Sequence, residues 1–247
     1  MTLTYLIISL IAGSVGSVAL AGLLLALNNQ KLLIISNYLM YLAGGTLLGA
    51  ALLGMIPKAI LQADVKTVLQ WVLIGILFFF ILEKIILWRS CGNQECERKT
   101  HAAAPLILIG DAFHNAIDGI VIAASFLTSI EMGVFVTISV MLHEIPQELG
   151  DFGILISSGL KKKTAFWANI FSGSTALVFG IAAYYTLESI KWLIPYALAF
   201  SAASFLYIAL ADLIPEMHRK TKIKDTLIQI ILIIIGVSII YLMTINH

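Results

Sequence analysis

The sequence contains little charge. Only 12% of its 247 residues are Asp, Glu, Lys or Arg, two are cysteines and five are prolines, whereas 60% are hydrophobic and the mean hydropathy is +0.99. So few charged groups exclude an ordinary soluble globular domain, and two cysteines exclude a disulfide-rich scaffold. A net charge of +1 provides no basic surface for nucleic acid. The composition therefore indicates an integral membrane protein embedded in a lipid bilayer.

Long apolar segments define the predicted fold. Segments of about 20 apolar residues, enough to cross a hydrocarbon core of about 30 Å, occur eight times in the sequence. The first lacks the basic start and short core of a cleavable signal, so it also reads as a spanning helix. We predict an all-α integral membrane protein, a single transmembrane domain over residues 1–247, with helices at about 4–27, 33–57, 67–88, 103–128, 132–159, 164–187, 192–215 and 226–244.

Lysine and arginine are unevenly distributed between the two sides of these helices. Eleven lie on one side: Lys31, Arg89, Arg98, Lys99, Lys161, Lys162, Lys163, Arg219, Lys220, Lys222 and Lys224. Three lie on the other side: Lys58, Lys66 and Lys191. Because basic loops stay in the cytoplasm, this bias predicts that both termini are extracytoplasmic in a multi-pass protein of the cell (cytoplasmic) membrane.

An internal repeat suggests a transporter. The segment Ala43–Lys58 aligns with Ser201–Glu216 at a constant offset of 158 residues, and the matches include Leu48 with Leu206, Ala51 with Ala209, Leu52 with Leu210, Ile56 with Ile214 and Pro57 with Pro215. The charge bias gives the two segments opposite directions across the membrane, as in the inverted repeats of secondary transporters. The unrepeated helices at 103–128 and 132–159 then fall in the middle, where a substrate site is expected.

Ionisable residues interrupt these two central helices. One contains His-Asn-Ala-Ile-Asp-Gly at 114–119, and the other contains His-Glu-Ile-Pro-Gln-Glu-Leu-Gly-Asp at 143–151. Each charged side chain at bilayer depth costs about 2.5–3.5 kcal/mol, which metal coordination would offset. At 100° per residue, the polar residues of each helix share a face, and the short turn near Ser129 makes the helices an antiparallel hairpin. We therefore predict that the two polar faces meet at mid-membrane.

The polar residues suggest a metal site. Imidazole, carboxylate and amide groups suit zinc(II) first, and iron(II), manganese(II) or cadmium(II) as alternatives. The metal is predicted as the transported substrate, with no cofactor. A hydrolase is a competing class, because His143 and Glu144 begin the His-Glu-x-x-His pattern of zinc proteases, although Gln147 replaces the second histidine. Asp111, Glu148, Asp151 and Asp212 are predicted to support the ligands or to line the pathway, and Glu83 is predicted to pair with Lys84 at a helix end.

The patterns His-Asn-x-x-Asp-Gly and His-Glu-x-Pro-x-Glu-x-Gly-Asp-Phe resemble the ZIP (zinc and iron permease) family, and Phe205–Glu216 resembles its seventh helix. The resemblance implies zinc(II) uptake into the cytoplasm through an inverted 3+2+3 helix arrangement, in which helices 1, 4, 5 and 6 slide as an elevator against the others, and it allows a homodimer. Members with this pattern usually carry histidine where this chain has Gln147. The resemblance also implies a binuclear metal centre at His114, Asn115, Asp118, His143, Glu144 and Gln147.

Overall fold

The computed structural model describes residues 2–91 and 100–245, which are helical apart from short turns and contain no strand. The first half of the chain forms α1 (Thr2–Ile11), η1 (Ala12–Gly16), α2 (Ser17–Leu24), α3 (Asn29–Gly49), η2 (Ala50–Met55), α4 (Ile56–Ile60), α5 (Val65–Cys91) and α6 (Thr100–Thr128). The second half forms α7 (Ile130–Ser157), α8 (Lys162–Gly173), α9 (Thr175–Ser189), η3 (Lys191–Leu193), α10 (Ile194–Tyr207), η4 (Ile208–Leu213), α11 (Ile214–His218) and α12 (Ile223–Ile245). Arg98 and Lys99, which belong to the predicted charge bias, lie outside the described residues.

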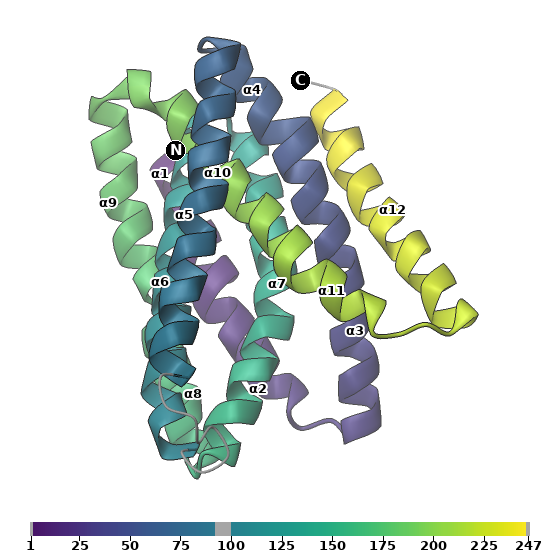
Figure 1. Ribbon diagram of the computed structural model, residues 1–247. Coiled ribbons are helices and arrows are strands. Elements are labelled where there is room, and N and C mark those ends of the chain that lie inside the picture. Colours follow the sequence, from purple (N-terminus) through teal and green to yellow (C-terminus); the bar gives the residue numbers. More distant parts are fainter. Residues whose placement is uncertain (1, 92–99, 246–247) are drawn as a thin grey trace.

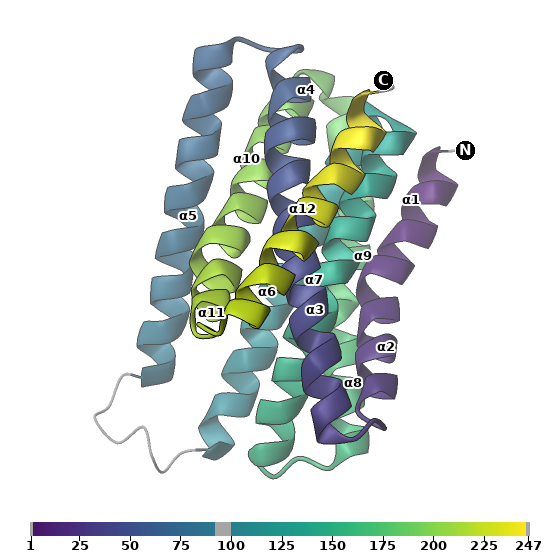
Figure 2. The same ribbon diagram turned by 90° about the vertical axis from the view of Figure 1, so that its right-hand side faces the viewer.

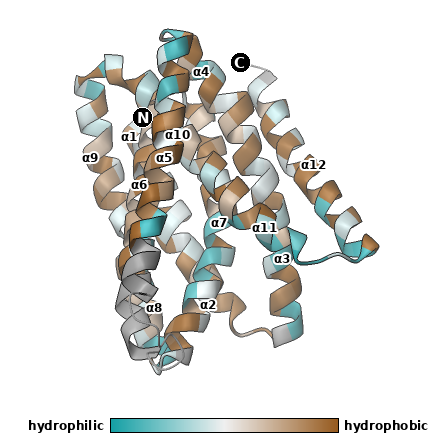
Figure 3. Ribbon diagram, in the orientation of Figure 1, coloured by the Kyte–Doolittle hydropathy of each residue, from teal (hydrophilic) through white to brown (hydrophobic). Residues whose placement is uncertain are grey.

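Six helical stretches among the described residues are long and apolar enough to cross a membrane: Thr2–Leu24, Gln30–Ile60, Val65–Ile85, Lys162–Ser189, Lys191–His218 and Ile223–Thr244. The prediction of an all-helical, multi-pass membrane protein is therefore confirmed. Figure 3 shows hydrophobic residues along most helices and hydrophilic residues on the lower half of α7, inside the bundle. The helices α6 and α7, which carry the ionisable residues of the two central segments, are not among these six stretches of described residues.

Three helices begin at side chains that cap their first turn. The backbone N–H of Lys31 donates to Asn28 Oδ1 at 2.9 Å, that of Thr67 to Asp64 Oδ2 at 2.9 Å, and that of Met132 to Ser129 Oγ at 3.1 Å. The hydrogen bond from the Thr67 backbone lowers the pKa of the exposed Asp64 carboxyl. Since α6 ends at Thr128 and α7 begins at Ile130, the cap at Ser129 is also the turn of the α6–α7 hairpin.

The structure repeats the offset found in the sequence. Three pairs of elements begin 158 residues apart in the chain: the π-helices η2 and η4, the short helices α4 and α11, and the long helices α5 and α12. Both α4 and α11 begin with Ile-Pro. A proline provides no backbone N–H, so the regular backbone hydrogen bonding of the helix is interrupted at the same place in both halves of the repeat. The helices α3 and α10 run in opposite directions (Figure 1).

Two pairs of helices make backbone contact through glycine. A Cβ atom built on Gly119 of α6 would lie 2.1 Å from the Ala176 carbonyl oxygen of α9, and one on Gly45 of α3 would lie 2.2 Å from the Ile233 carbonyl oxygen of α12. No larger side chain fits at either position. Figure 2 shows α5 and α1 at opposite edges of the molecule, with the α6–α7 hairpin between them. The hairpin is therefore held firmly on one side by α9.

Candidate metal centre between α6 and α7

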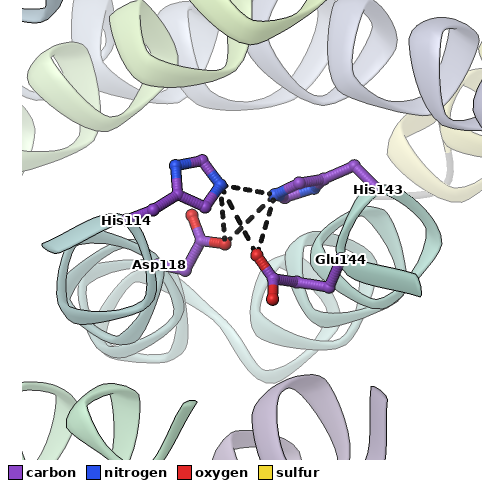
Figure 4. A group of neighbouring side chains, drawn as sticks. All are labelled: His114, Asp118, His143 and Glu144. Carbon is purple, nitrogen blue, oxygen red and sulfur yellow. Dashed lines mark hydrogen bonds and ion pairs between the residues drawn. The ribbon is translucent and has the colours of Figure 1, made fainter. Parts of the chain in front are cut away.

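Four side chains from the hairpin converge on one point (Figure 4). Their ligand atoms all lie within 4.8 Å of one another. On α6 the two residues are four positions apart, which places both on one face of the helix, and on α7 they are adjacent. We call this set the histidine group: His114, Asp118, His143 and Glu144.

The spacing of these atoms suits a tetrahedral metal. His143 Nε2 lies 3.1 Å from Asp118 Oδ2 and 3.6 Å from Glu144 Oε1, and His114 Nε2 lies 3.8 Å and 3.5 Å from the same two oxygens. The two Nε2 atoms are 3.2 Å apart. Zinc binds nitrogen and oxygen at about 2.0–2.2 Å, so tetrahedral ligand atoms lie about 3.3–3.6 Å apart. The histidine group could therefore hold zinc(II) with small side-chain movements.

Burial and backbone contacts orient the group. Asp118, His143 and Glu144 are at most 2% exposed, whereas the His114 side chain is 21% exposed. His143 Nδ1 lies 3.0 Å from the Ser139 carbonyl oxygen, one helical turn earlier. Because a carbonyl only accepts, Nδ1 carries the proton and Nε2 presents its lone pair to the group. A metal bound at Nε2 requires this tautomer.

The two amides of the predicted centre contact Asp111. Asn115 Nδ2 donates to Asp111 Oδ1 at 3.0 Å and to its backbone oxygen at 3.2 Å. Gln147 Nε2 donates to the same Oδ1 at 3.5 Å. The structure thus brings four of the six predicted ligands together and places both amides beside a carboxylate one turn away. That these amides bind metal stays a prediction.

A second set of carboxylates adjoins the histidine group. Ligand atoms of Asp111, Glu144 and Glu148 lie within 4.8 Å of one another, and all three residues are buried. We call this set the acidic group; it shares Glu144 with the histidine group. Asp151, one turn beyond Gln147 on α7, is half-buried and lies outside both groups. Asp111 and Glu148 thus adjoin the histidine group, and their supporting role stays a prediction.

Two cavities reach the histidine group from the side of α10 and α11. One, of about 180 Å³, is lined by Glu83, His114, Tyr207 and Asp212 among others. The other is lined by His143, Gln147, Asp212, Glu216 and Arg219 among others. Asp212 lines both cavities, and its place on a pathway stays a prediction.

The predicted pairing of Glu83 with Lys84 is wrong. The Tyr207 hydroxyl donates to Glu83 Oε2, while Lys84 Nζ lies over the Phe80 ring at 5.6 Å from its centre. Neighbouring residues on a helix point about 100° apart, so Glu83 faces α10 and Lys84 turns away from it. Sequence reasoning missed Tyr207 as well; the only signal was an acidic residue within a spanning helix.

The fold and the site define a helical membrane protein with a buried cluster of metal-ligand side chains. The family model described as ZIP Zinc transporter matches residues 89–244, and the chain belongs to this family. A family of transporters gives no support to the hydrolase alternative, and the protein is not an enzyme.

Relatives with curated names point to the same family. The chain is 37% identical over 145 residues to "Zinc transporter foi" of Drosophila melanogaster, covering 57% of this chain and 20% of that protein. It is 32% identical over 181 residues to "Zinc transporter ZIP13" of Pongo abelii, covering 70% and 52%. It is 39% identical over 120 residues to "Metal cation symporter ZIP14" of Xenopus tropicalis, covering 47% and 25%. The chain thus spans between a fifth and about half of the length of these relatives.

Proposed function

We propose that this protein transports divalent metal across the cell membrane, with zinc(II) as its preferred substrate and the histidine group as the binding site. The observation that carries the proposal is the spacing of 3.1–3.8 Å between ligand atoms of two imidazoles and two carboxylates in a buried position. Relatives named as zinc transporters support zinc(II) as the substrate. All four ligands come from one chain, so the site itself does not depend on a homodimer.

We propose eight spanning helices with both termini extracytoplasmic. The helices α6 and α7 contain 29 and 28 residues, and at about 1.5 Å per residue each exceeds the hydrocarbon thickness of about 30 Å. The beginnings of α3 and α8 lie at the lower end in Figure 1, and α4 and η3 lie toward the upper end. The basic segments before α3 and α8 therefore share one end, which the positive-inside rule assigns to the cytoplasm.

The helix pairs support an elevator movement. Backbone contact through Gly119 holds α6 to α9, and contact through Gly45 holds α3 to α12. These pairs fall on opposite sides of the proposed division into helices 1, 4, 5 and 6 and helices 2, 3, 7 and 8. Movement of the first set as one body would carry the histidine group without breaking either contact. If the metal moves into the cytoplasm, the cavities beside Asp212 are the ones that open toward the cytoplasm.

A carrier that prefers iron(II) or manganese(II) is the second candidate. The acidic group favours manganese(II) in particular, because carboxylate oxygens suit manganese, whereas imidazole suits zinc and iron. Uptake of zinc(II) by purified protein in sealed liposomes, with iron(II) and manganese(II) as competitors, ranks the three ions. Stronger competition by manganese(II) than by unlabelled zinc(II) would favour the second candidate.

The variants His114→Ala and Glu144→Ala test the site. Each removes one ligand, so we expect at least about a tenfold loss of zinc(II) uptake. Glu188→Gln, at an exposed position near the end of α9, is the matched control and should transport normally. Elution as a single species from a sizing column shows that each variant folds. Normal uptake by both folded ligand variants would refute the proposed site.

A further inference from the structure

A groove of about 450 Å³ opens on the surface of the bundle, between two tightly packed pairs of helices. One wall is α6 with α9, which are held in backbone contact at Gly119. The other wall is α5 with α10, where a Cβ atom built on Gly75 would lie 2.5 Å from the Ala203 Cβ atom. Because α9 packs chiefly on α6 and α10 chiefly on α5, a space remains between the two pairs.

The groove is lined chiefly by apolar side chains. Trp71 comes from α5, Ile120 from α6, Phe179 from α9 and Phe200 from α10. Ile120 follows the predicted ligand Asp118 by two residues, which turns its side chain by about 200° to the opposite face of α6. The groove is therefore separate from the histidine group, and its apolar lining offers no ligands to a cation.

Aromatic rings and a lysine lie at the upper end of the groove. The centre of the Tyr196 ring lies 6.0 Å from that of Trp71 and 6.3 Å from that of Trp192. Tryptophan and tyrosine gather where the hydrocarbon of a bilayer meets the polar headgroups. Lys191 is exposed and precedes Trp192 in η3, which lies toward the upper end in Figure 1. The groove thus begins at headgroup level beside a positive charge and runs down to Ile120, well inside α6.

An acyl chain fits this space better than a helix of another protein does. A helix with its side chains is about 10–12 Å wide, so a space of about 450 Å³ would take only about one turn of it. An acyl chain is a single row of methylene groups, which can follow a narrow groove along its length. Inside a bilayer, contact is driven by van der Waals packing, and an unfilled groove loses that packing.

We propose that one acyl chain of a phospholipid occupies this groove, with the phosphate of the lipid beside Lys191. Glu188 is exposed near the same turn, so the charge at the mouth does not select an anionic headgroup over a zwitterionic one. Recognition therefore depends on the acyl chain and on the phosphate that all phospholipids share. The two walls fall on opposite sides of the proposed elevator division, so the bound lipid would lie along the seam between the two moving parts.

A phospholipid with brominated acyl chains tests the site, because bromine quenches tryptophan fluorescence at close range. The purified full-length chain is stripped of lipid in detergent and titrated with brominated phosphatidylcholine, and no metal is added. The chain contains four tryptophans, and Trp71 lines the groove. We expect saturable quenching in the parent protein and a clear loss of the saturable part in Trp71→Phe. Quenching that rises without saturation would overturn the proposal, because it would indicate general contact with the surrounding lipid.

Ala182→Phe tests the proposal by filling the groove. Ala182 lines the groove and is exposed, so the added ring takes the place of the acyl chain without entering the core. The affinity for brominated lipid should fall at least several-fold. Val178→Phe is the matched control, because it adds a ring to the same helix at a position that is 65% exposed and lies outside the groove lining. It should bind lipid as the parent does, and elution as a single species shows that each variant folds.

Lys191→Gln tests the position of the phosphate. It removes the charge at the mouth and leaves the apolar lining intact, so lipid affinity should fall by less than in Ala182→Phe. Equal affinity in the parent and Ala182→Phe would overturn the groove as the site, and unchanged affinity in Lys191→Gln would overturn the place of the phosphate. Failure of the proposed function looks different, because zinc(II) uptake would then be absent while the metal-free lipid titration still responds to residue 182.

Discussion

Replacing Gly119 with alanine should disturb the metal centre through helix packing alone. Gly119 follows Asp118 directly, and an added Cβ would lie 2.1 Å from the Ala176 carbonyl oxygen. Ordinary contact begins at 3.4 Å, so α6 and α9 would have to separate by the difference, 1.3 Å. The opposing atom belongs to the backbone, which cannot turn aside as a flexible side chain can. The strain therefore reaches Asp118, whose Oδ2 lies 3.1 Å from His143 Nε2.

The structure sets the scale of the effect. Overpacking in a well-packed interior costs about 1–3 kcal/mol, which corresponds to several degrees in melting temperature. A displacement of about 1 Å in a positioned group can cost about a hundredfold in function. We therefore expect Gly119→Ala to melt several degrees below the parent protein and to lose at least about tenfold in zinc(II) uptake.

Gly153→Ala is the matched control. It makes the same substitution in α7, but nothing lies within 4 Å of the added Cβ. Alanine favours a helix over glycine by about 0.5–1 kcal/mol, so this variant should be as stable as the parent or slightly more stable. Melting is followed by tryptophan fluorescence in detergent, and uptake is measured in liposomes. If Gly119→Ala behaved like Gly153→Ala in both assays, the close contact between α6 and α9 would be refuted.

Three further predictions concern the surroundings of the site. Gln147→His places an imidazole four residues after His143, so zinc(II) should bind more tightly in a competition titration; unchanged affinity would show that position 147 does not reach the metal. Because metal ligands must be deprotonated, the apparent zinc(II) affinity should fall as pH decreases from about 8 to 5, and a flat profile would contradict this. Tyr207→Phe removes the hydroxyl that donates to Glu83. Initial rates of uptake, measured over a range of zinc(II) concentrations, should then show a lower maximal rate and an unchanged apparent affinity for zinc(II). A change in that affinity alone would instead place Glu83 at the metal.

Local periodicity predicted the part of the site that lies within single helices. The spacing of His114 and Asp118 puts both on one face of α6, and the turn at Ser129 requires an antiparallel partner. These two facts suffice to predict that the polar residues of α6 and α7 face each other. Hydropathy likewise indicated the membrane class, because apolar segments of spanning length are a property of sequence alone.

Contacts between distant helices could not be predicted in this way. Tyr207 and Glu83 are 124 residues apart, and only the packing of α10 against α5 brings them together. The position of Asn169 beside Glu148 likewise depends on how α8 packs against α7. Helical angle alone also could not show that the amides of Asn115 and Gln147 contact Asp111, because this depends on side-chain torsions. Each of these contacts depends on tertiary packing, which a periodicity argument does not contain.

The two halves of the repeat match in backbone and differ in charge. At the offset of 158 residues, Asp212 of η4 corresponds to Gly54 of η2, and Glu216 of α11 corresponds to Lys58 of α4. A symmetric pair of helix breaks therefore carries acidic side chains at one end of the molecule and a small or basic residue at the other. Acidic residues attract a cation and a lysine repels it. Both cavities that reach the histidine group lie on the acidic side and include Asp212. The two halves of the repeat therefore combine the same backbone break with opposite side-chain charge, a difference that the backbone pattern alone does not contain.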